Sequence, residues 1–208
     1  MTLPIPISLA VEDDLSESVL RRILSTYPGR FAVGNVFGRS GFGYLKKQVS
    51  AFNNAAKHLP FLLLTDLDRY ECPPSLLADW LSSERHKHFL LRVAVREVES
   101  WLLGDPVGLS RFLRLRRPTE IVDPERLHDA KNALLACAVR SPSRSLRESL
   151  VSRSKQSGRL LQGPDYNGTL ARFVFSSWDL DGAKRKCLSL SRLCGAIERL
   201  ATDYDTPQ

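Results

Sequence analysis

The apolar run at residues 61–65, Phe-Leu-Leu-Leu-Thr, limits the fold of this chain more than any other segment. An uninterrupted apolar run of this length predicts a strand buried on both faces, as in α/β proteins. Asp66 and Asp68 follow it, and because side chains alternate along a strand we expect them to point one way and Leu67 the other. Two like charges at such a strand end repel each other unless a cation lies between them. Ligands of open α/β sheets bind at this edge, and oxygen ligands favour Mg²⁺ or Mn²⁺, so the segment predicts a divalent-metal site.

The spacing of apolar residues elsewhere predicts more strands and the helices between them. Strands are expected at residues 5–11, 31–37 and 89–95, and helices at 15–27, 45–58 and 73–81. This alternation predicts an α/β fold with a mostly parallel sheet of about four strands and covering helices.

Beyond Asp105 prolines become frequent and strand signals fade. Helices are expected there at residues 124–139, 146–154, 169–175 and 188–200. We therefore predict an α/β metal-binding core over residues 1–105, followed by a mainly helical, basic region over 106–208 that packs on it.

The cysteines and the hydropathy indicate the compartment. None of the apolar stretches approaches the ~20 residues that span a bilayer, and the first residues do not have the pattern of a secretory signal. Cys72, Cys137, Cys187 and Cys194 are scattered without a C-x-x-C pair, which is typical of reduced thiols. We expect a cytoplasmic protein that has no membrane partner.

Positive charge is concentrated in the second half of the chain. Residues through Asp105 hold 12 Lys and Arg against 12 Asp and Glu, whereas the remainder holds 18 against 11 and so carries the whole net charge of +7. This asymmetry indicates a nucleic-acid partner, although a solvated basic surface explains the charge equally well. The candidate contacts in this half are Arg140, Arg144, Arg147, Arg153 and Lys155.

A glycine-rich segment at residues 38–43 offers a second set of phosphate contacts. Its backbone N–H groups can approach a phosphate, with Arg39, Lys46 and Lys47 supplying positive charge. The segment is not a P-loop, because G-x-x-x-x-G-K-[ST] is absent. A flexible turn between a strand and a helix is the alternative interpretation.

Acidic residues follow three of the predicted strands. Glu12 to Glu17 follow the first, Asp66 and Asp68 the third, and Glu97 and Glu99 the fourth. Because the carboxyl ends of parallel strands share one edge, these groups can converge as two-metal phosphodiester chemistry requires, with ions about 3.5–4 Å apart. Helix capping by Asp13 or Asp14, and pairing of Arg96 with a neighbouring glutamate, are the structural alternatives.

These motifs resemble a known family. Glu12 after an apolar strand, an acidic helix start and a buried strand ending in Asp66-x-Asp68 resemble the TOPRIM domain shared by topoisomerases, primases and the OLD-type nucleases of phage defence. The wider chain resembles a bacterial TOPRIM-like family of unknown function at residues 11–17, 96–103 and 163–167. The last of these motifs, Gly-Pro-Asp-Tyr-Asn, has no chemistry that we assign from sequence.

The resemblance implies roles for individual residues. Glu12, Asp66 and Asp68 would bind the metal, with Glu12 also a general acid or base, and Lys131 would stabilise developing charge. Glu17 would match the second acid of OLD-type domains, and Glu97 and Glu99 would complete a second metal site. The chain departs from the family pattern because Asp13 replaces a glycine and one extra residue precedes Glu17, so Asp14 competes for that role.

The resulting functional hypothesis is an Mg²⁺- or Mn²⁺-dependent nuclease that acts on nucleic acid, with DNA favoured over RNA. The resemblance also implies a role in anti-phage defence beside a partner ATPase, because this sequence has no Walker motif of its own. One alternative is a non-catalytic TOPRIM-like scaffold that binds nucleic acid or a partner protein. Another is a phosphatase of the haloacid-dehalogenase type, whose first motif resembles residues 62–68 but whose later G-D-x-x-x-D motif is absent.

Overall fold

The structure, a computed structural model, describes residues 3–38 and 40–204. The chain forms two compact units. Unit 1 contains the residues up to Val95 and those from Ser189 onward, and unit 2 contains Arg96–Leu188. The sequence pattern had placed the division after Asp105 and the last helix in the second region. That helix instead rejoins unit 1 because its apolar residues, including Leu193 and Ile197, are buried there.

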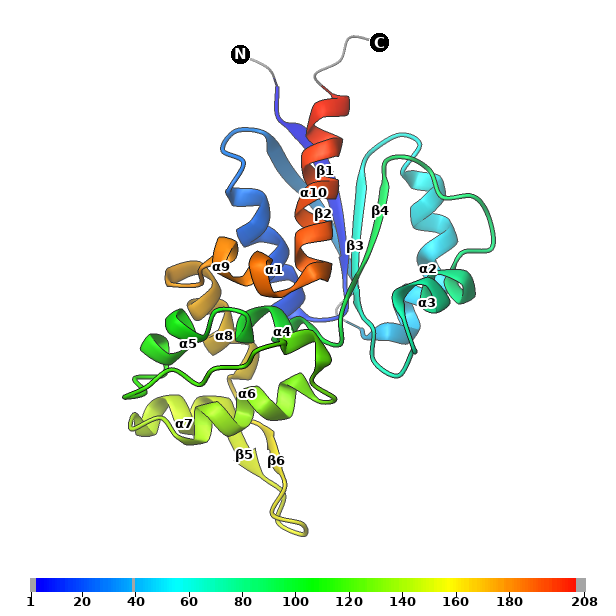
Figure 1. Cartoon of the computed structure of the whole chain (residues 1–208). Helices are drawn as coiled ribbons and strands as arrows, with labels where there is room; N and C mark the ends of the chain where they lie inside the picture. The colour runs from blue at the N-terminus through cyan, green and yellow to red at the C-terminus, as the bar shows by residue number, and fades with distance from the viewer. Residues whose placement is uncertain (1–2, 39, 205–208) are drawn as a thin grey trace. The chain divides into compact units, whose positions relative to one another are not determined.

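Unit 1 is built on a parallel sheet, which confirms the predicted fold class (Figure 1). Its strands are β1 (Ile5–Val11), β2 (Phe31–Gly38), β3 (Phe61–Asp66) and β4 (Phe89–Ala94), in the order β2-β1-β3-β4. All three neighbouring pairs run parallel.

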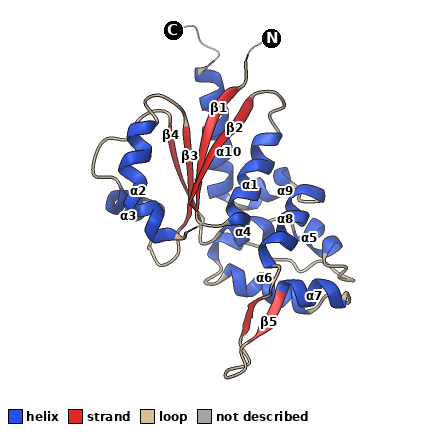
Figure 2. Ribbon diagram, turned by 180° about the vertical axis from the view of Figure 1, so that it is seen from behind, coloured by secondary structure: helices blue, strands red, loops and turns tan. Residues whose placement is uncertain are grey.

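Helices cover both faces of this sheet (Figures 1 and 2). The helices of unit 1 are α1 (Asp14–Ser25), α2 (Phe42–Ala55), α3 (Pro73–Trp80) and α10 (Leu188–Asp203). On one face, α2 and α3 bury Phe52 and Trp80 against Leu63 and Leu91 of the sheet. On the other face, α1 and α10 lie together, and the Tyr27 hydroxyl beyond α1 donates to Glu198 Oε1 of α10 at 3.2 Å.

The strand order creates a switch point between β1 and β3. The chain leaves β1 toward β2 on one side and later returns to β3 on the other side. Val11, the last residue of β1, pairs with Leu64 of β3, so Glu12 emerges beside Thr65 and Asp66. Crevices at such switch points, outside the carboxyl ends of the strands, are where open α/β sheets bind ligands.

Unit 2 is mainly helical, as predicted. Its elements are α4 (Val98–Leu103), α5 (Pro106–Phe112), the 3₁₀ helix η1 (Pro124–Arg126), α6 (Ala130–Val139), α7 (Arg144–Leu150), β5 (Val151–Arg153), β6 (Leu160–Gln162), α8 (Tyr166–Ser176) and α9 (Leu180–Lys186). Trp101, Leu134 and Phe173 are among its fully buried side chains.

A β-hairpin replaces part of one predicted helix in unit 2. The helix expected over residues 146–154 ends at Leu150, and β5 then pairs antiparallel with β6. The backbone N–H of Gly163 donates to the Leu150 carbonyl at 2.9 Å, which fixes the hairpin against the end of α7. A side chain at Gly163 would collide with the carbonyl oxygen of Ser149, so this close approach requires glycine.

None of the helices in the described part of the chain has both the length and the apolar character that a bilayer crossing requires.

Candidate functional site

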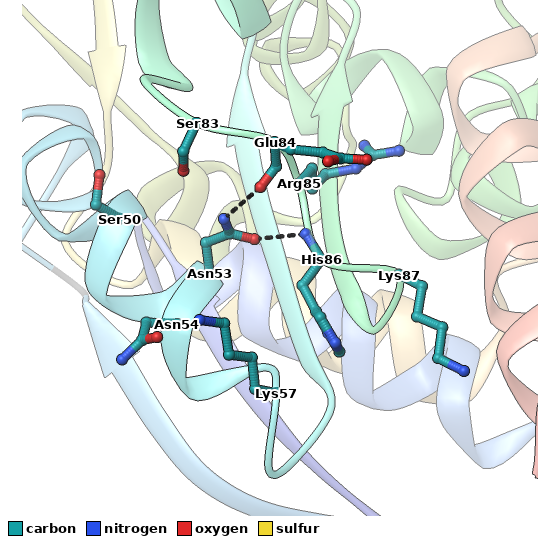
Figure 3. Close-up of a pocket in the computed structure, with 9 residues that line it drawn as sticks. All are labelled: Ser50, Asn53, Asn54, Lys57, Ser83, Glu84, Arg85, His86 and Lys87. Atoms are coloured by element: carbon teal, nitrogen blue, oxygen red, sulfur yellow. Dashed lines mark hydrogen bonds between the residues drawn. The ribbon is translucent and has the colours of Figure 1, made fainter.

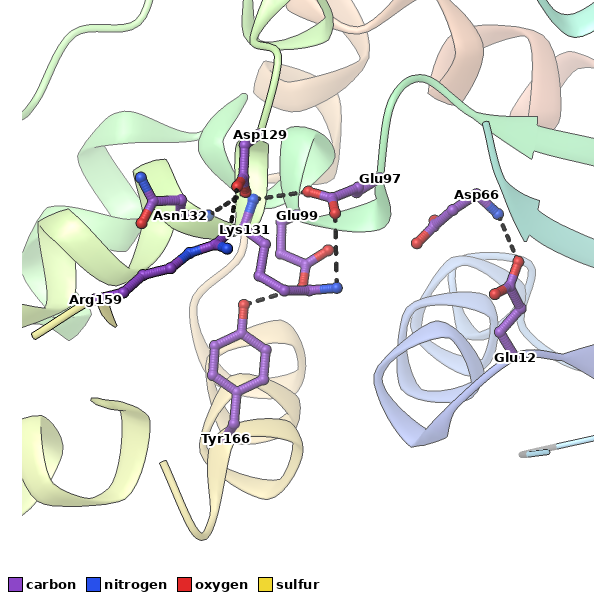
Figure 4. Close-up of polar contacts among 9 residues, drawn as sticks. All are labelled: Glu12, Asp66, Glu97, Glu99, Asp129, Lys131, Asn132, Arg159 and Tyr166. Atoms are coloured by element: carbon purple, nitrogen blue, oxygen red, sulfur yellow. Dashed lines mark hydrogen bonds and ion pairs between the residues drawn. The ribbon is translucent and has the colours of Figure 1, made fainter. Parts of the chain in front are cut away.

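Glu12 links the ends of β1 and β3 at the switch point (Figure 4). Its Oε1 atom accepts hydrogen bonds from the backbone N–H of Asp66 at 2.9 Å and from the Thr65 hydroxyl. Thr65 is buried, so this part of the anchor is shielded from water. The two bonds fix the Glu12 carboxylate on the carboxyl edge of the sheet.

Two acidic residues, Asp68 and Asp13, are the charged groups among the described residues that act on Glu12. Burial raises the pKa of Glu12, the bonds from Thr65 and Asp66 lower it, and the charges of Asp68 and Asp13 raise it. Among the described residues no lysine or arginine forms an ion pair or hydrogen bond with the Glu12 carboxylate. Such a carboxylate is stabilised in its charged form by an external cation.

Asp68 contributes to this site from a turn rather than from the strand. The strand ends at Asp66, and the N–H of the buried Leu67 donates to the Ala94 carbonyl at 2.9 Å. Asp68 is exposed and has a φ of 48°, in the left-handed region that aspartate tolerates better than most residues. Asp68 therefore lies beyond the strand, where strand alternation does not determine the direction of its side chain, and its charge acts on Glu12.

The remaining acids near the start of α1 have internal partners. Asp13 is the N-cap of α1 and accepts from the Ser16 N–H at 2.8 Å, as the capping alternative predicted. Glu17 is buried, and its Oε1 accepts from Arg21 Nε at 2.7 Å. Asp14 is exposed on the first turn of the helix. The metal-binding roles of Asp14 and Glu17 remain predictions.

The glycine-rich segment passes close to the backbone of Glu12. Gly38 has a φ of 105°, and a side chain there would collide with the Val11 carbonyl oxygen, so only glycine fits. The N–H of Gly41 donates to the Glu12 carbonyl at 3.3 Å, and α2 begins at the next residue. The predicted phosphate contact Arg39 lies outside the described residues.

Unit 2 contains a second acidic cluster, formed by three residues that the sequence analysis singled out (Figure 4). Lys131 Nζ lies 3.7 Å from Glu97 Oε1 and 3.6 Å from Glu99 Oε1. The Lys131 backbone N–H also donates to Glu97 Oε2 at 2.8 Å. Lys131 is thus the counter-ion of both carboxylates.

Glu99 is the most deeply buried acid of this cluster, with 2% of its surface exposed. Burial raises the pKa of Glu99 to about 7, an effect that Lys131 opposes and the charge of Glu97 reinforces. The Tyr166 hydroxyl donates to Glu99 Oε1 at 3.0 Å. Sequence reasoning missed this role of Tyr166, although the motif at residues 163–167 that contains it had been noticed.

A pocket of about 340 Å³ opens beside this cluster within unit 2. Glu97, Lys131, Asp129 and Arg159 line it, together with apolar residues such as Leu135. Arg159 Nη2 lies 3.6 Å from Asp129 Oδ2. The pocket therefore presents cations and carboxylates side by side, an arrangement suited to a polar ligand.

The other predicted nucleic-acid contacts differ in whether their side chains bind other residues of the protein. In unit 1, Lys46 Nζ lies 2.6 Å from Asp79 Oδ2, whereas Lys47 is exposed. In unit 2, Arg140 donates to Thr119 Oγ1, Arg144 to Glu148 Oε1 and Arg147 to the Ser141 carbonyl. Arg153 and Lys155 lie exposed on the β5–β6 hairpin.

The oxygen-rich donor set of unit 1 suits a hard divalent cation. In the part of the chain that the structure describes, no three histidine, cysteine, aspartate or glutamate side chains are grouped so that they could hold a metal ion. Mg²⁺ is usually held by only one or two carboxylates and takes its other ligands from water and substrate phosphates. One or two of the carboxylates at this edge, with Glu12 among them, would suffice for that pattern, whereas Glu97 and Glu99 already share Lys131.

Comparison with known proteins finds similarity among solved structures only. No family model matches this chain, and no curated protein matches it. Among solved structures, the chain is similar to the C-terminal region of the Burkholderia pseudomallei OLD protein, with a TM-score of 0.47 and 14% sequence identity. The match covers 94% of this chain and 98% of that chain.

Proposed function

We propose that this protein is a divalent-metal-dependent nucleic-acid phosphodiesterase, that is, a nuclease. The observation that carries the proposal is the anchoring of Glu12 to the end of β3, beside Asp66 and under the charge of Asp68. The anchoring groups are an uncharged hydroxyl and a backbone amide, so they orient the carboxylate without neutralising it.

Glu12, Asp66 and Asp68 would hold Mg²⁺ or Mn²⁺ at the carboxyl edge of the sheet. When bound, the ion lowers the pKa of a coordinated water and offsets negative charge on a phosphodiester. The residues of the chain would position the carboxylates that hold the ion. The bond from the Asp66 amide keeps Glu12 Oε1 at the end of β3, and the left-handed turn at Asp68 brings a further carboxylate near it.

The cluster of unit 2 supports acid–base chemistry. With a pKa of about 7, the Glu99 carboxyl can hold or release a proton near neutral pH, as general acid–base catalysis requires. Lys131 carries the positive charge that would stabilise a developing anion. A second metal at Glu97 and Glu99 belongs to the same proposal, and such an ion would have to displace Lys131 from between these carboxylates.

The charge of the chain supports a polyanionic substrate. The net charge of +7 and the exposed Arg153 and Lys155 on the hairpin suit contacts with a phosphate backbone. DNA as the substrate, a partner ATPase and a role in anti-phage defence are parts of this proposal that rest on the sequence resemblance alone.

The direct test is cleavage of plasmid DNA in Mg²⁺ or Mn²⁺ by the wild type and by Asp66→Ala/Asp68→Ala. We expect metal-dependent cutting by the wild type and none by the double variant. The matched control, Glu71→Ala/Glu84→Ala, removes two exposed acids from the same unit and should cut at the wild-type rate.

Binding of Mn²⁺, followed by electron paramagnetic resonance, separates the nuclease from the alternatives. A wild type that binds Mn²⁺ and DNA without any turnover would indicate the scaffold instead. Hydrolysis of p-nitrophenyl phosphate with intact plasmid would indicate a phosphatase. Cutting that persists in EDTA or in Asp66→Ala/Asp68→Ala would contradict the proposed site.

A further inference from the structure

Strand β4 carries an arginine where the pattern of the sheet requires an apolar residue. Leu91 and Val93 face the core under α2 and α3, so Leu90 and Arg92 face the side of α10. The partner of Arg92 on β3 is Leu64, which is completely buried. The Nε of Arg92 is itself buried and has no hydrogen-bond partner among the described residues. Buried polar groups nearly always have partners, so this exception requires an explanation.

Two further arginines surround Arg92. Burial, and then the charges of Arg85 and Arg199, lower the pKa of Arg92 to about 10. No acid is among the causes of that shift. In residues 3–38 and 40–204, none of these three guanidinium groups forms a hydrogen bond or an ion pair. Positive charges brought together repel one another unless an anion offsets them, and among the described residues none of the three guanidinium groups is paired with an acid.

The three arginines line one cavity of unit 1, with a volume of about 350 Å³. Lys87 adds a fourth cation, and Asp203 is the only acidic residue in the lining that the structure describes. Leu90 and Leu200 form part of its wall. A cavity of this volume is at the lower end of the range for small-molecule sites, about 300–1,000 Å³.

The loop that supplies Arg85 and Lys87 is held in place by a buried side chain (Figure 3). Asn53, of which 8% is exposed, donates from Nδ2 to the Glu84 carbonyl at 2.9 Å and accepts at Oδ1 from the His86 N–H at 2.8 Å. Arg85 therefore projects from between two anchored backbone groups. A positive cluster whose backbone is fixed in advance loses less entropy when it binds an anion.

We propose that this cavity binds a small phosphorylated molecule through Arg85, Arg92 and Arg199. The net charge of its lining suits a ligand with two or more negative charges, and guanidinium groups match phosphate oxygens by paired hydrogen bonds. A nucleic-acid strand fits less well, because such sites are extended grooves with aromatic platforms and this lining contains no aromatic residue among those described.

The site is distinct from the proposed metal centre. Arg85 and Lys87 precede β4, at the amino ends of the strands, and Arg92 lies within β4 on the α10 side of the sheet. Glu12 and Asp66 lie instead where β1 and β3 end, at the carboxyl edge. The inference therefore does not depend on nuclease activity.

Pyrophosphate is the first probe, titrated into the full chain by calorimetry at constant ionic strength. We expect binding by the wild type and at least about tenfold weaker binding by Arg92→Met, which keeps the apolar stem and removes the guanidinium. Arg117→Met removes an exposed arginine of unit 2 and should bind as the wild type does.

Thermal unfolding separates a lost ligand contact from a misfolded variant. Without ligand, Arg92→Met should unfold at a higher temperature than the wild type, because a buried and repelled charge is gone. With pyrophosphate, the wild type should be stabilised and Arg92→Met should not.

Either no binding of pyrophosphate to the wild type or equal binding to Arg92→Met would overturn the proposal. Parallel titrations with inorganic phosphate and ADP identify the ligand class further. Tighter binding of ADP would assign a nucleotide, and tighter binding of pyrophosphate a ligand recognised by its phosphates alone. A different outcome is a single-stranded oligonucleotide that binds more tightly than any of these ligands and loses that binding in Arg92→Met. That result would assign the site to nucleic acid and refute the small-ligand assignment.

Discussion

The two acidic clusters of this protein use the same residue types but differ in what balances their charge. In unit 1, Glu12 is held by the Thr65 hydroxyl and the Asp66 amide, which are uncharged. In unit 2, Glu97 and Glu99 share the ammonium group of Lys131. Burial is the largest cause of the raised pKa in both Glu12 and Glu99, but only at Glu99 does a lysine oppose it.

This difference separates two kinds of site. A carboxylate such as that of Glu12, which is held by uncharged groups among the described residues, gains most from an external ion, whereas carboxylates that share a lysine are already neutralised in part. The first arrangement suits metal binding, and the second suits the transfer of protons and the stabilisation of anions. Four experiments test whether the two clusters differ in this way.

The largest effect is expected at Glu12. Glu12→Gln keeps the shape of the side chain but removes its charge, so nuclease turnover should fall by at least about 10²-fold, the lower limit for a general acid or base. The free energy of unfolding should stay the same or rise, because repulsion from Asp68 and Asp13 is relieved. Plasmid cleavage and urea unfolding measure the two quantities, with Glu71→Gln as the exposed control. Equal turnover by Glu12→Gln and the control would mean that the Glu12 carboxylate has no part in catalysis, so the two clusters would not differ in function as proposed.

The pH dependence of stability should reveal Glu99. Its folded pKa of about 7 lies above the ordinary 4.5, so the folded state keeps a proton that the unfolded state releases. The resulting stabilisation is complete below pH 4.5 and is lost as the pH rises through 7. It amounts to at most about 3 kcal/mol by the size of the shift.

Urea unfolding in EDTA between pH 4 and 8 measures this dependence. The wild type should lose stability across that range relative to Glu99→Gln, which does not titrate. Parallel pH profiles for the two proteins would mean that Glu99 is ionised throughout.

Removing the shared cation should have a smaller effect. Lys131→Met leaves Glu97 and Glu99 without their counter-ion, but Lys131 is one-third exposed, so we expect a loss of about 1–2 kcal/mol at pH 8. The loss should shrink at pH 5, where Glu99 is protonated. Lys155→Met, which removes an exposed lysine of the hairpin, is the control. A loss independent of pH would point to packing rather than charge.

The smallest effect is expected at Tyr166. Tyr166→Phe removes one hydrogen bond to Glu99 and should cost about 0.5–1.5 kcal/mol. Because that bond lowers the pKa of Glu99, the carboxyl should titrate at a higher pH in the variant. Titration of the Glu99 side chain by NMR measures the shift. A shift toward lower pH would contradict the assigned role of the hydroxyl.

The sheet of unit 1 was largely predictable because each strand is indicated by the residues within it. Buried strands such as β3 and β4 are unbroken apolar runs, and the acids that follow them lie at one edge once the strands are parallel. The turn at Asp68 was not predictable in this way. Asp68 has a left-handed conformation beyond the end of the strand, so strand alternation does not predict the position of its carboxylate, although its charge raises the pKa of Glu12.

Unit 2 was less predictable because its contacts are distant in sequence and its elements are short. Helices of six or seven residues such as α4 and α9 are too short to be stable alone, so packing rather than propensity determines them. The bond from Tyr166 to Glu99 joins residues 67 positions apart. Residue spacing cannot reveal such a pair, although the motif at residues 163–167 marked its location.

The return of α10 to unit 1 has a consequence for synthesis on the ribosome. All of unit 2 is translated between β4 and the helix that covers the Arg92 side of the sheet. At about 5–20 residues per second, that face stays open for roughly 5–20 s after β4 has been made. During this interval the growing chain exposes apolar strand surface, such as Leu64 and Leu90, that the finished protein buries. A chaperone that shields this surface would therefore act before α10 emerges.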